Sequence, residues 1–194
     1  MRLTAAGSTL VELLVAAAGM CVIILGVAAM LNQSGKINQR EHLRAEVQAN
    51  ARNCMARVIK TLRNAGWDPG DHGIATVALD PDPGDSISQI EAFIDANGDG
   101  LTAGTAGEQV LIRHVGDRVE WSTDGLGDFK TLAWNITNDA DGDGTVEPMF
   151  VPDDVSDPHR IRVQVTAEGS APDPETRGAV RYTVTSEVVL RKKL

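Results

Sequence analysis

The chain has 194 residues, of which 42% are hydrophobic and 23% charged, so one modest domain with a core can form beyond a membrane anchor. Its net charge of −9 is unevenly distributed: residues 32–66 hold seven Lys or Arg against two Glu, and residues 67–194 hold ten against 24 Asp or Glu. So acidic a C-terminal region argues against nucleic-acid binding, because phosphates require a basic surface.

The N-terminal segment combines a short leader with a long apolar run. Arg2 is the one charged residue before Gly7, and Glu12 is the one acidic residue between Leu10 and Leu31. Such a run can cross a bilayer as a helix, which needs about 20 apolar residues. A carboxylate within it costs about 2.5–3.5 kcal/mol on insertion. We therefore expect Glu12 to need a partner, and the one nearby is the α-amino group that a cut after Gly7 creates.

A secretory signal peptide is the first alternative for this segment. In such a peptide the apolar core has about 7–15 residues, and the small residue at the cleavage site follows it. Here Gly7 comes before the core, and the core is too long. A plain signal anchor stays open as the second alternative.

The stretch Gly7–Glu12, which reads Gly-Ser-Thr-Leu-Val-Glu, leads into this apolar run. It resembles the processing site of type IV prepilins and of type II secretion pseudopilins. The resemblance implies that prepilin peptidase cuts between Gly7 and Ser8 and methylates the new N-terminus, although Ser8 stands where phenylalanine is usual. It also implies that Glu12 is the family's assembly glutamate, which meets the N-terminal amine of a neighbouring subunit.

Residues 32–65 predict an amphipathic continuation of the helix. Their apolar positions step by three or four residues and form one stripe, which consists of Leu43, Val47, Ala51, Met55, Val58 and Leu62. Gly66 is the expected end of the helix, with Pro69 just after it. Cys21 and Cys54 would lie about 50 Å apart in one helix, so no disulfide is expected.

Beyond the helix the pattern changes to a period of two residues, which is typical of strands. The predicted strands are 74–79, 87–94, 109–115, 118–122, 160–166 and 180–190, with a tight hairpin at Gly116 and Asp117. Segments 80–85, 153–158 and 169–178 are rich in Asp, Pro and Gly and predict loops. Residues 59–67 and 181–191 resemble the helix end and the last strand of minor pilins of the PilW type.

Two acidic loops share one layout. Both the first acidic loop (95–101) and the second acidic loop (139–145) alternate oxygen-bearing side chains and have glycine at the sixth place, like the first half of an EF-hand calcium loop. The predicted Ca²⁺ ligands of the first loop are Asp95, Asn97, Asp99, the carbonyl of Leu101 and Glu108. Those of the second loop are Asp139, Asp141, Asp143, the carbonyl of Thr145 and Glu147. The alternative is a pair of solvated Asp/Gly turns without metal.

The sequence shows no pattern of a catalytic site, so we expect no enzyme activity. The histidines show no metal-ligand or triad spacing (His42, His72, His114 and His159), and no phosphate loop or dinucleotide fingerprint occurs. A hydrolase that uses two of the many carboxylates is the weakest alternative.

Together these patterns predict an α+β protein of the type IV pilin-like class, with a long N-terminal helix packed on an antiparallel β-rich head. Its expected parts are a leader (1–7), a transmembrane and polymerisation helix (8–31), an amphipathic stem (32–66) and a head (67–194). The resemblance implies a structural minor pilin that enters, primes or caps a pilus. Its partners would be prepilin peptidase, other pilin subunits and the bacterial inner membrane, with a periplasmic head before assembly.

Two other functions stay open at this point. One is a minor pseudopilin of a type II secretion system, which would have the same anchor and a similar head. The other is a membrane-anchored, calcium-dependent adhesin that never polymerises.

Overall fold

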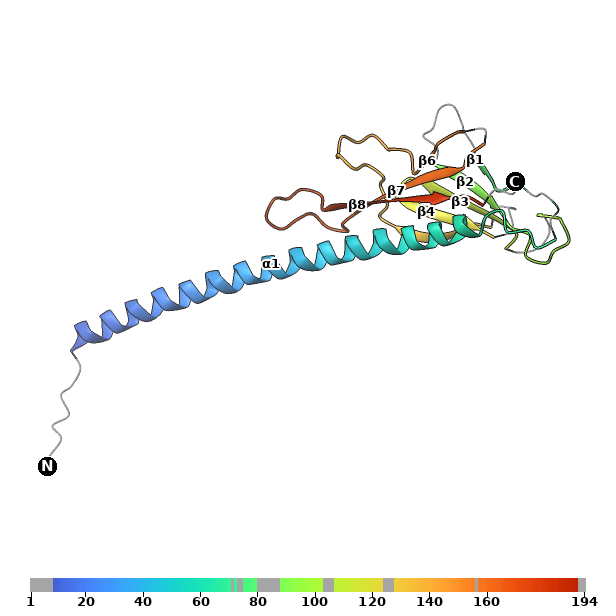
Figure 1. Cartoon of the computed structure of the whole chain (residues 1–194). Coiled ribbons are helices and arrows are strands. Elements are labelled where there is room, and N and C mark those ends of the chain that lie inside the picture. The colour runs from blue at the N-terminus through green and yellow to red at the C-terminus, as the bar shows by residue number, and fades with distance from the viewer. Residues whose placement is uncertain are drawn as a thin grey trace. The chain divides into compact units, whose positions relative to one another are not determined.

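The computed structural model describes residues 9–70, 72, 75–79, 88–102, 107–123, 128–155 and 157–191. Its one long helix, α1 (Leu10–Asn64), agrees with the predicted helix, and Gly66 follows it with a φ of 76° (Figure 1). Glycine adopts this left-handed conformation without the steric cost of a Cβ, which is why it ends helices. The chain divides into two compact units, residues 1–42 and 43–194, and each is described by itself.

Within the second unit, α1 contributes one apolar stripe to the core. The buried residues of the helix are Val47, Ala51, Cys54, Met55, Val58 and Leu62. They follow the predicted spacing of three and four residues, since such positions lie on one face of a helix. Leu43, at the start of the predicted stripe, is only half-buried, and Cys54 joins the stripe.

The strands form two antiparallel sheets. The five-stranded sheet is a meander in chain order, made of β1 (Val77–Leu79), β2 (Gln89–Phe93), β3 (Gln109–Val115), β4 (Arg118–Ser122) and β5 (Lys130–Trp134). The three-stranded sheet has the order β6 (Phe150–Pro152), β7 (Arg160–Glu168) and β8 (Arg181–Val189). One bridge, between Ile136 and Ala167, connects β7 with the chain after β5.

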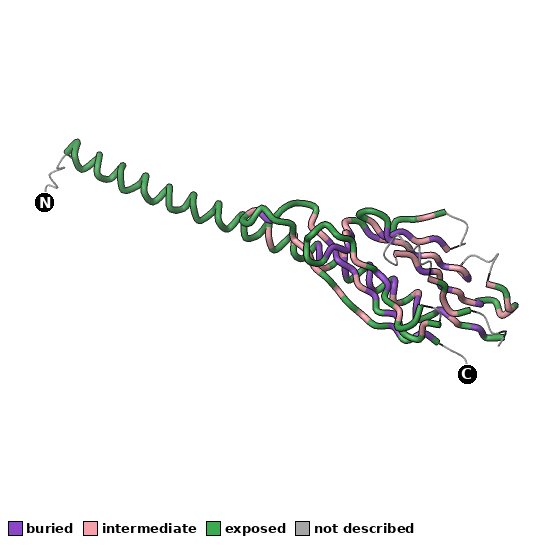
Figure 2. Tube along the Cα trace, turned by 90° about the horizontal axis from the view of Figure 1, so that it is seen from above, coloured by how far each residue is buried: buried purple, intermediate pink, exposed green. Residues whose placement is uncertain are grey.

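One core joins α1 to both sheets. Val58 and Leu62 of the helix belong to the same buried cluster as Ile112 of β3 and Val163 of β7. In Figure 2 the buried segments of the second unit lie where helix and strands meet. Alternate residues of β7 are buried, as its apolar–polar alternation predicts. The α+β class, with a long helix packed on antiparallel sheets, is therefore confirmed.

The strand predictions are partly confirmed. Strands β3, β4, β7 and β8 lie where period two placed them, and a two-residue turn at Gly116 and Asp117 joins β3 to β4. Strands β5 and β6 were not predicted. The described part of the first predicted strand is shorter, because 75–76 are not in a strand, and Ile74 and Ile87 lie outside the described residues. Cys21 and Cys54 are both free, as expected.

Candidate functional site

The N-terminal half of α1 exposes an uninterrupted apolar surface. Every residue from Leu10 to Leu31 is exposed, and no part of the stretch that is long enough to cross a membrane is buried (Figure 2). An exposed apolar surface of this size indicates contact with a membrane or with other protein. By length and composition this segment could anchor the chain in a membrane. The predicted processing site, Gly7 and Ser8, lies outside the described residues.

Glu12 has a partner within its own chain. The N–H of Thr9 donates to Glu12 Oε2 at 2.9 Å, and the N–H of Glu12 donates to Thr9 Oγ1 at 3.3 Å. This reciprocal pair is a capping box, which satisfies two N–H groups at the start of a helix. The expectation that Glu12 has no neighbour except a free N-terminus is therefore wrong. Its pairing with the amine of another subunit stays a prediction.

The two acidic loops have the same local conformation. In each loop the first Asp accepts hydrogen bonds from the N–H groups of the fourth and sixth residues. In the first loop, Gly98 and Gly100 donate to Asp95 at 2.6 and 2.9 Å. In the second loop, Gly142 and Gly144 donate to Asp139 at 2.7 and 3.2 Å. All four glycines have φ between 79° and 88°. The loops therefore need glycine at these places, as the calcium-loop pattern indicates.

Glu108 reaches the first acidic loop although it stands two residues beyond the usual EF-hand spacing. Its Oε1 accepts the N–H of Asn97 at 3.3 Å, and the residue is fully buried. Within the described part of the chain, Oε2 of this carboxylate has no hydrogen-bond partner. Asp99 accepts a hydrogen bond from Asn97 Nδ2 at 2.9 Å. Among the described residues, Asp95 and Asp99 do not belong to one group of three side chains whose ligand atoms lie close enough to share a metal ion.

The second acidic loop brings its three aspartates together. Donor oxygens of Asp139, Asp141 and Asp143 all lie within 4.8 Å of one another. Glu147 lies against the same loop, because its Oε2 accepts the N–H of Ala140 at 3.0 Å. Four of the predicted ligands therefore converge on one small region, and their oxygen donors suit a hard cation such as Ca²⁺.

The charges of the second loop are partly balanced by an arginine of β8. Arg181 lies with Nη2 3.6 Å from Asp139 Oδ2, and its Nε donates to Glu168 Oε2 at 2.8 Å. Hydrogen bonds from Thr145, first from its backbone and then from its side chain, hold the pKa of the Asp143 carboxyl below its usual value. Asp143 is therefore ionised at neutral pH, as a cation ligand must be.

The two predicted carbonyl ligands occupy equivalent places. Leu101 and Thr145 each donate their N–H to the aspartate two residues earlier, at 2.7 Å in both loops. This bond fixes the chain at the seventh position, where an EF-hand loop supplies a backbone carbonyl.

The structure also places a histidine beside the first loop that its spacing in the sequence did not indicate. His72 Nδ1 lies 3.4 Å from an oxygen of Asp68 and 3.4 Å from an oxygen of Asp95. The spacing of the histidines in the sequence does not indicate this arrangement of His72. Its neighbour Asp95 is 23 residues away in the chain, so no local pattern could have revealed the contact.

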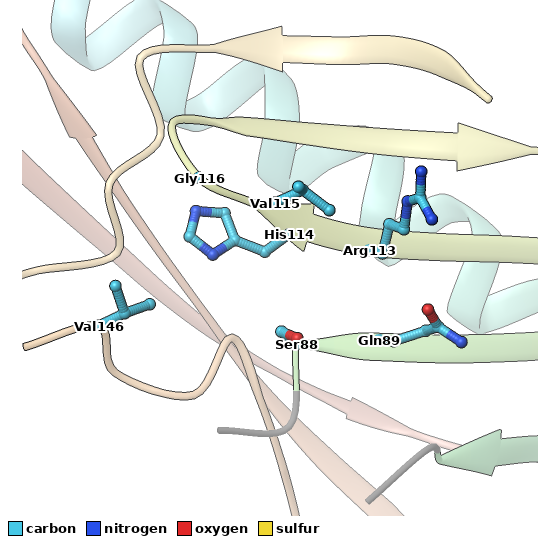
Figure 3. Close-up of a pocket in the computed structure, with 7 residues that line it drawn as sticks. All are labelled: Ser88, Gln89, Arg113, His114, Val115, Gly116 and Val146. Carbon is cyan, nitrogen blue, oxygen red and sulfur yellow. The ribbon is translucent and has the colours of Figure 1, made fainter. Parts of the chain in front are cut away.

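A pocket of about 390 Å³ opens beside the end of β3. Figure 3 shows His114, Ser88 and Val146 around it, and Gly116 at its rim. The ring of His114 is held by a 2.7 Å hydrogen bond between Nε2 and the carbonyl oxygen of Ile136. The described residues that line it also include Gln89, Arg113 and Val115.

Comparison of the chain with protein-family models, with curated proteins and with solved structures finds no match.

Proposed function

We propose that this protein is a minor pilin, a structural subunit that is anchored in the bacterial inner membrane and then enters, primes or caps a type IV pilus. The observation that carries the proposal is the division of α1. Its half from Leu10 to Leu31 is apolar and exposed, while residues from Val47 to Leu62 are part of the core of a β-rich head. A membrane covers the apolar half before assembly, and the same half of neighbouring subunits covers it in a filament.

Processing would link these two states. Prepilin peptidase cuts between Gly7 and Ser8, and the new amine is that of Ser8, two positions before Leu10, where α1 begins. Glu12 then has two possible partners, the N–H of Thr9 in its own chain and the amine of a neighbouring subunit. Pairing of the charges within the apolar filament avoids an uncompensated buried charge, which costs about 3–5 kcal/mol.

Ca²⁺ would brace the head at the second acidic loop. The support is the convergence of Asp139, Asp141 and Asp143, together with the bond from the N–H of Thr145 to Asp143, which fixes the chain at the seventh position. Arg181 balances part of this charge when no cation is present. The cation would hold the chain between β5 and β6 in one conformation and take no part in chemistry.

The test compares Glu12→Gln with Glu12→Ala in cells that carry the protein's own pilus genes. Glutamine keeps the capping box, which accepts either Glu or Gln, and removes the charge. We expect both variants to insert in the membrane and to lose the leader, measured by fractionation and intact mass. We expect both to be at least tenfold depleted from sheared filaments, measured by immunoblotting.

The control is Asp117→Ala, which removes an exposed carboxylate in the β3–β4 turn and should enter filaments normally. Normal incorporation of Glu12→Gln alone would assign Glu12 to helix capping and remove the charge-pairing role. A wild-type protein that stays in the membrane while filaments form would favour the non-polymerising adhesin. Loss of secretion in place of loss of pili on deletion would favour the pseudopilin.

A further inference from the structure

The residues that follow α1 are attached to the end of β2 and to the first acidic loop by two backbone hydrogen bonds. The N–H of Gly66 donates to the carbonyl of Phe93 at 2.8 Å, and the N–H of Asp95 donates to the carbonyl of Trp67 at 2.8 Å. These bonds hold the residues that follow the helix against the loop after β2. Asp68, the next residue, thus lies beside Asp95 although 27 positions separate them in the chain.

The imidazole of His72 fits into room left by two glycines. A Cβ atom at Gly100 would lie 2.6 Å from Cγ of the ring, and one at Gly70 would lie 1.9 Å from Cε1. Both distances are shorter than real Cβ contacts, so a side chain at either position would require the ring of His72 to shift. The ring is therefore seated between Gly70 and Gly100, with Nδ1 toward the carboxylates of Asp68 and Asp95.

The distances suit metal ligands better than a hydrogen bond. His72 Nδ1 is 3.4 Å from both Asp68 Oδ1 and Asp95 Oδ2. A hydrogen bond from imidazole N–H to oxygen is about 2.7–3.2 Å long, and Nδ1 carries at most one proton for two oxygens. Ligand atoms bound tetrahedrally at about 2.0–2.1 Å lie roughly 3.4 Å apart. All three donors lie within 4.8 Å of one another.

The burial of the acidic groups adds a separate argument for a cation. The side chains of Asp68 and Asp95 are 2% and 0% exposed. Glu108 is also fully buried, its Oε1 faces the loop through Asn97, and its Oε2 has no hydrogen-bond donor within the described residues. Buried carboxylates are costly unless they are hydrogen-bonded or paired with positive charge. Asp95 is already stabilised by the N–H groups of Gly98, Asp99 and Gly100, so the argument from burial rests on Glu108, whose Oε2 a divalent cation at this loop would supply with positive charge.

We propose that Asp68, His72 and Asp95 bind one divalent transition-metal ion of the Zn²⁺ class, and that this ion fastens the end of α1 to the first acidic loop. Imidazole is a preferred ligand of such ions, whereas Ca²⁺ takes oxygen ligands. Three protein ligands leave a fourth position for water, and the side chain of His72 is 40% exposed to solvent. This site is separate from the all-oxygen second loop and does not depend on the pilin assignment.

The test uses the full chain in detergent micelles, without an affinity tag and stripped of metal by a chelator. Titration with Zn²⁺ in a calorimeter should show one tight site per chain. His72→Gln and Asp68→Asn should each weaken this binding at least tenfold. The matched control is His159→Gln, which changes another histidine of the same head. His159 Nδ1 lies beside the carbonyl of Asp157, and among the described residues His159 belongs to no group of side chains that could hold a metal ion. This variant should bind Zn²⁺ like the wild type.

Hydrogen exchange tests the fastening directly. Zn²⁺ should slow exchange of the amides of Gly66 and Asp95 in the wild type and not in His72→Gln. Thermal unfolding in chelator shows whether each variant is folded. The proposal is wrong if the wild type does not bind Zn²⁺, or if it binds Zn²⁺ without a change in exchange at these amides. Equal loss of Zn²⁺ binding in His159→Gln and His72→Gln would overturn it as well.

Discussion

Cys54 is a buried thiol in the stripe of α1 that faces the core. Its residue is 1% exposed, and burial raises the pKa of the thiol to about 12, with a smaller opposite effect from Arg57. The thiol is therefore a small apolar group of the core rather than a reactive nucleophile.

This pKa makes the stability of the head depend on alkaline pH. Below about pH 9 the thiol of Cys54 is protonated in both states, and its burial has its full effect. Above that pH the unfolded chain loses the proton and the folded chain keeps it, so the free energy of unfolding falls by on the order of 1 kcal/mol at pH 10. In Cys54→Ala this fall disappears between pH 8 and pH 10, measured by urea unfolding of the full chain in micelles. Cys21→Ala, at an exposed position, should keep it.

At the scale of elements, the acidic loops are built by hydrogen bonds between residues at most five positions apart. Their conformation is therefore encoded locally, which explains why the Asp/Asn/Gly spacing predicted it. The surroundings of the two loops differ, since His72 lies beside the first and Arg181 beside the second. Identical loop conformations thus lie in different electrostatic environments.

Asp141→Ala should remove the stabilisation of the head by Ca²⁺. The variant lacks one of the three converging aspartates but leaves the bonds from Gly142 and Gly144 to Asp139 in place. We expect Ca²⁺ at 100 times its dissociation constant to add about 2.7 kcal/mol to the free energy of unfolding of the wild type. Thermal unfolding with Ca²⁺ and with chelator measures this difference. Asp128→Ala, which removes an exposed carboxylate elsewhere in the head, should keep the stabilisation by Ca²⁺. If Ca²⁺ does not change the unfolding temperature of the wild type, the calcium site is contradicted.

At the scale of the complete chain, α1 has two halves in opposite surroundings. Residues up to Leu31 have their apolar side chains exposed, and residues from Val47 onward share one core with both sheets. The first half is apolar around most of its circumference, whereas the second half carries its apolar residues on one face. The head therefore needs the second half of the helix for its core, and the first half needs a partner outside the chain.

Leu62→Ala should destabilise the head strongly. Leu62 is 0% exposed and packs in the cluster that contains residues of both sheets. Loss of a buried leucine side chain costs about 2–5 kcal/mol, through lost burial and the cavity left behind. Leu31→Ala, in the same helix at 68% exposure, should change the free energy of unfolding of the head by less than about 0.5 kcal/mol. Equal effects in urea unfolding of the two variants would contradict a core shared by helix and sheets.

Strands β5 and β6 were not predicted because their sequences lack the apolar–polar alternation of the other strands. In β5 only Ala133 is buried, so the segment has no apolar alternation to read. Strand β6 has three residues and ends in Pro152, a residue that fits only an edge strand. Both strands exist because an adjacent strand supplies hydrogen bonds, β4 for β5 and β7 for β6.

Local interactions were enough to specify α1, its end at Gly66, the alternating strands and the two acidic loops, because each depends on residues a few positions apart. Contacts between distant residues were not readable in this way. Arg181 reaches the second loop from β8, and His72 meets Asp95. These contacts form only when the packing of α1 on the sheets brings the segments together, because the core fixes which loops become neighbours.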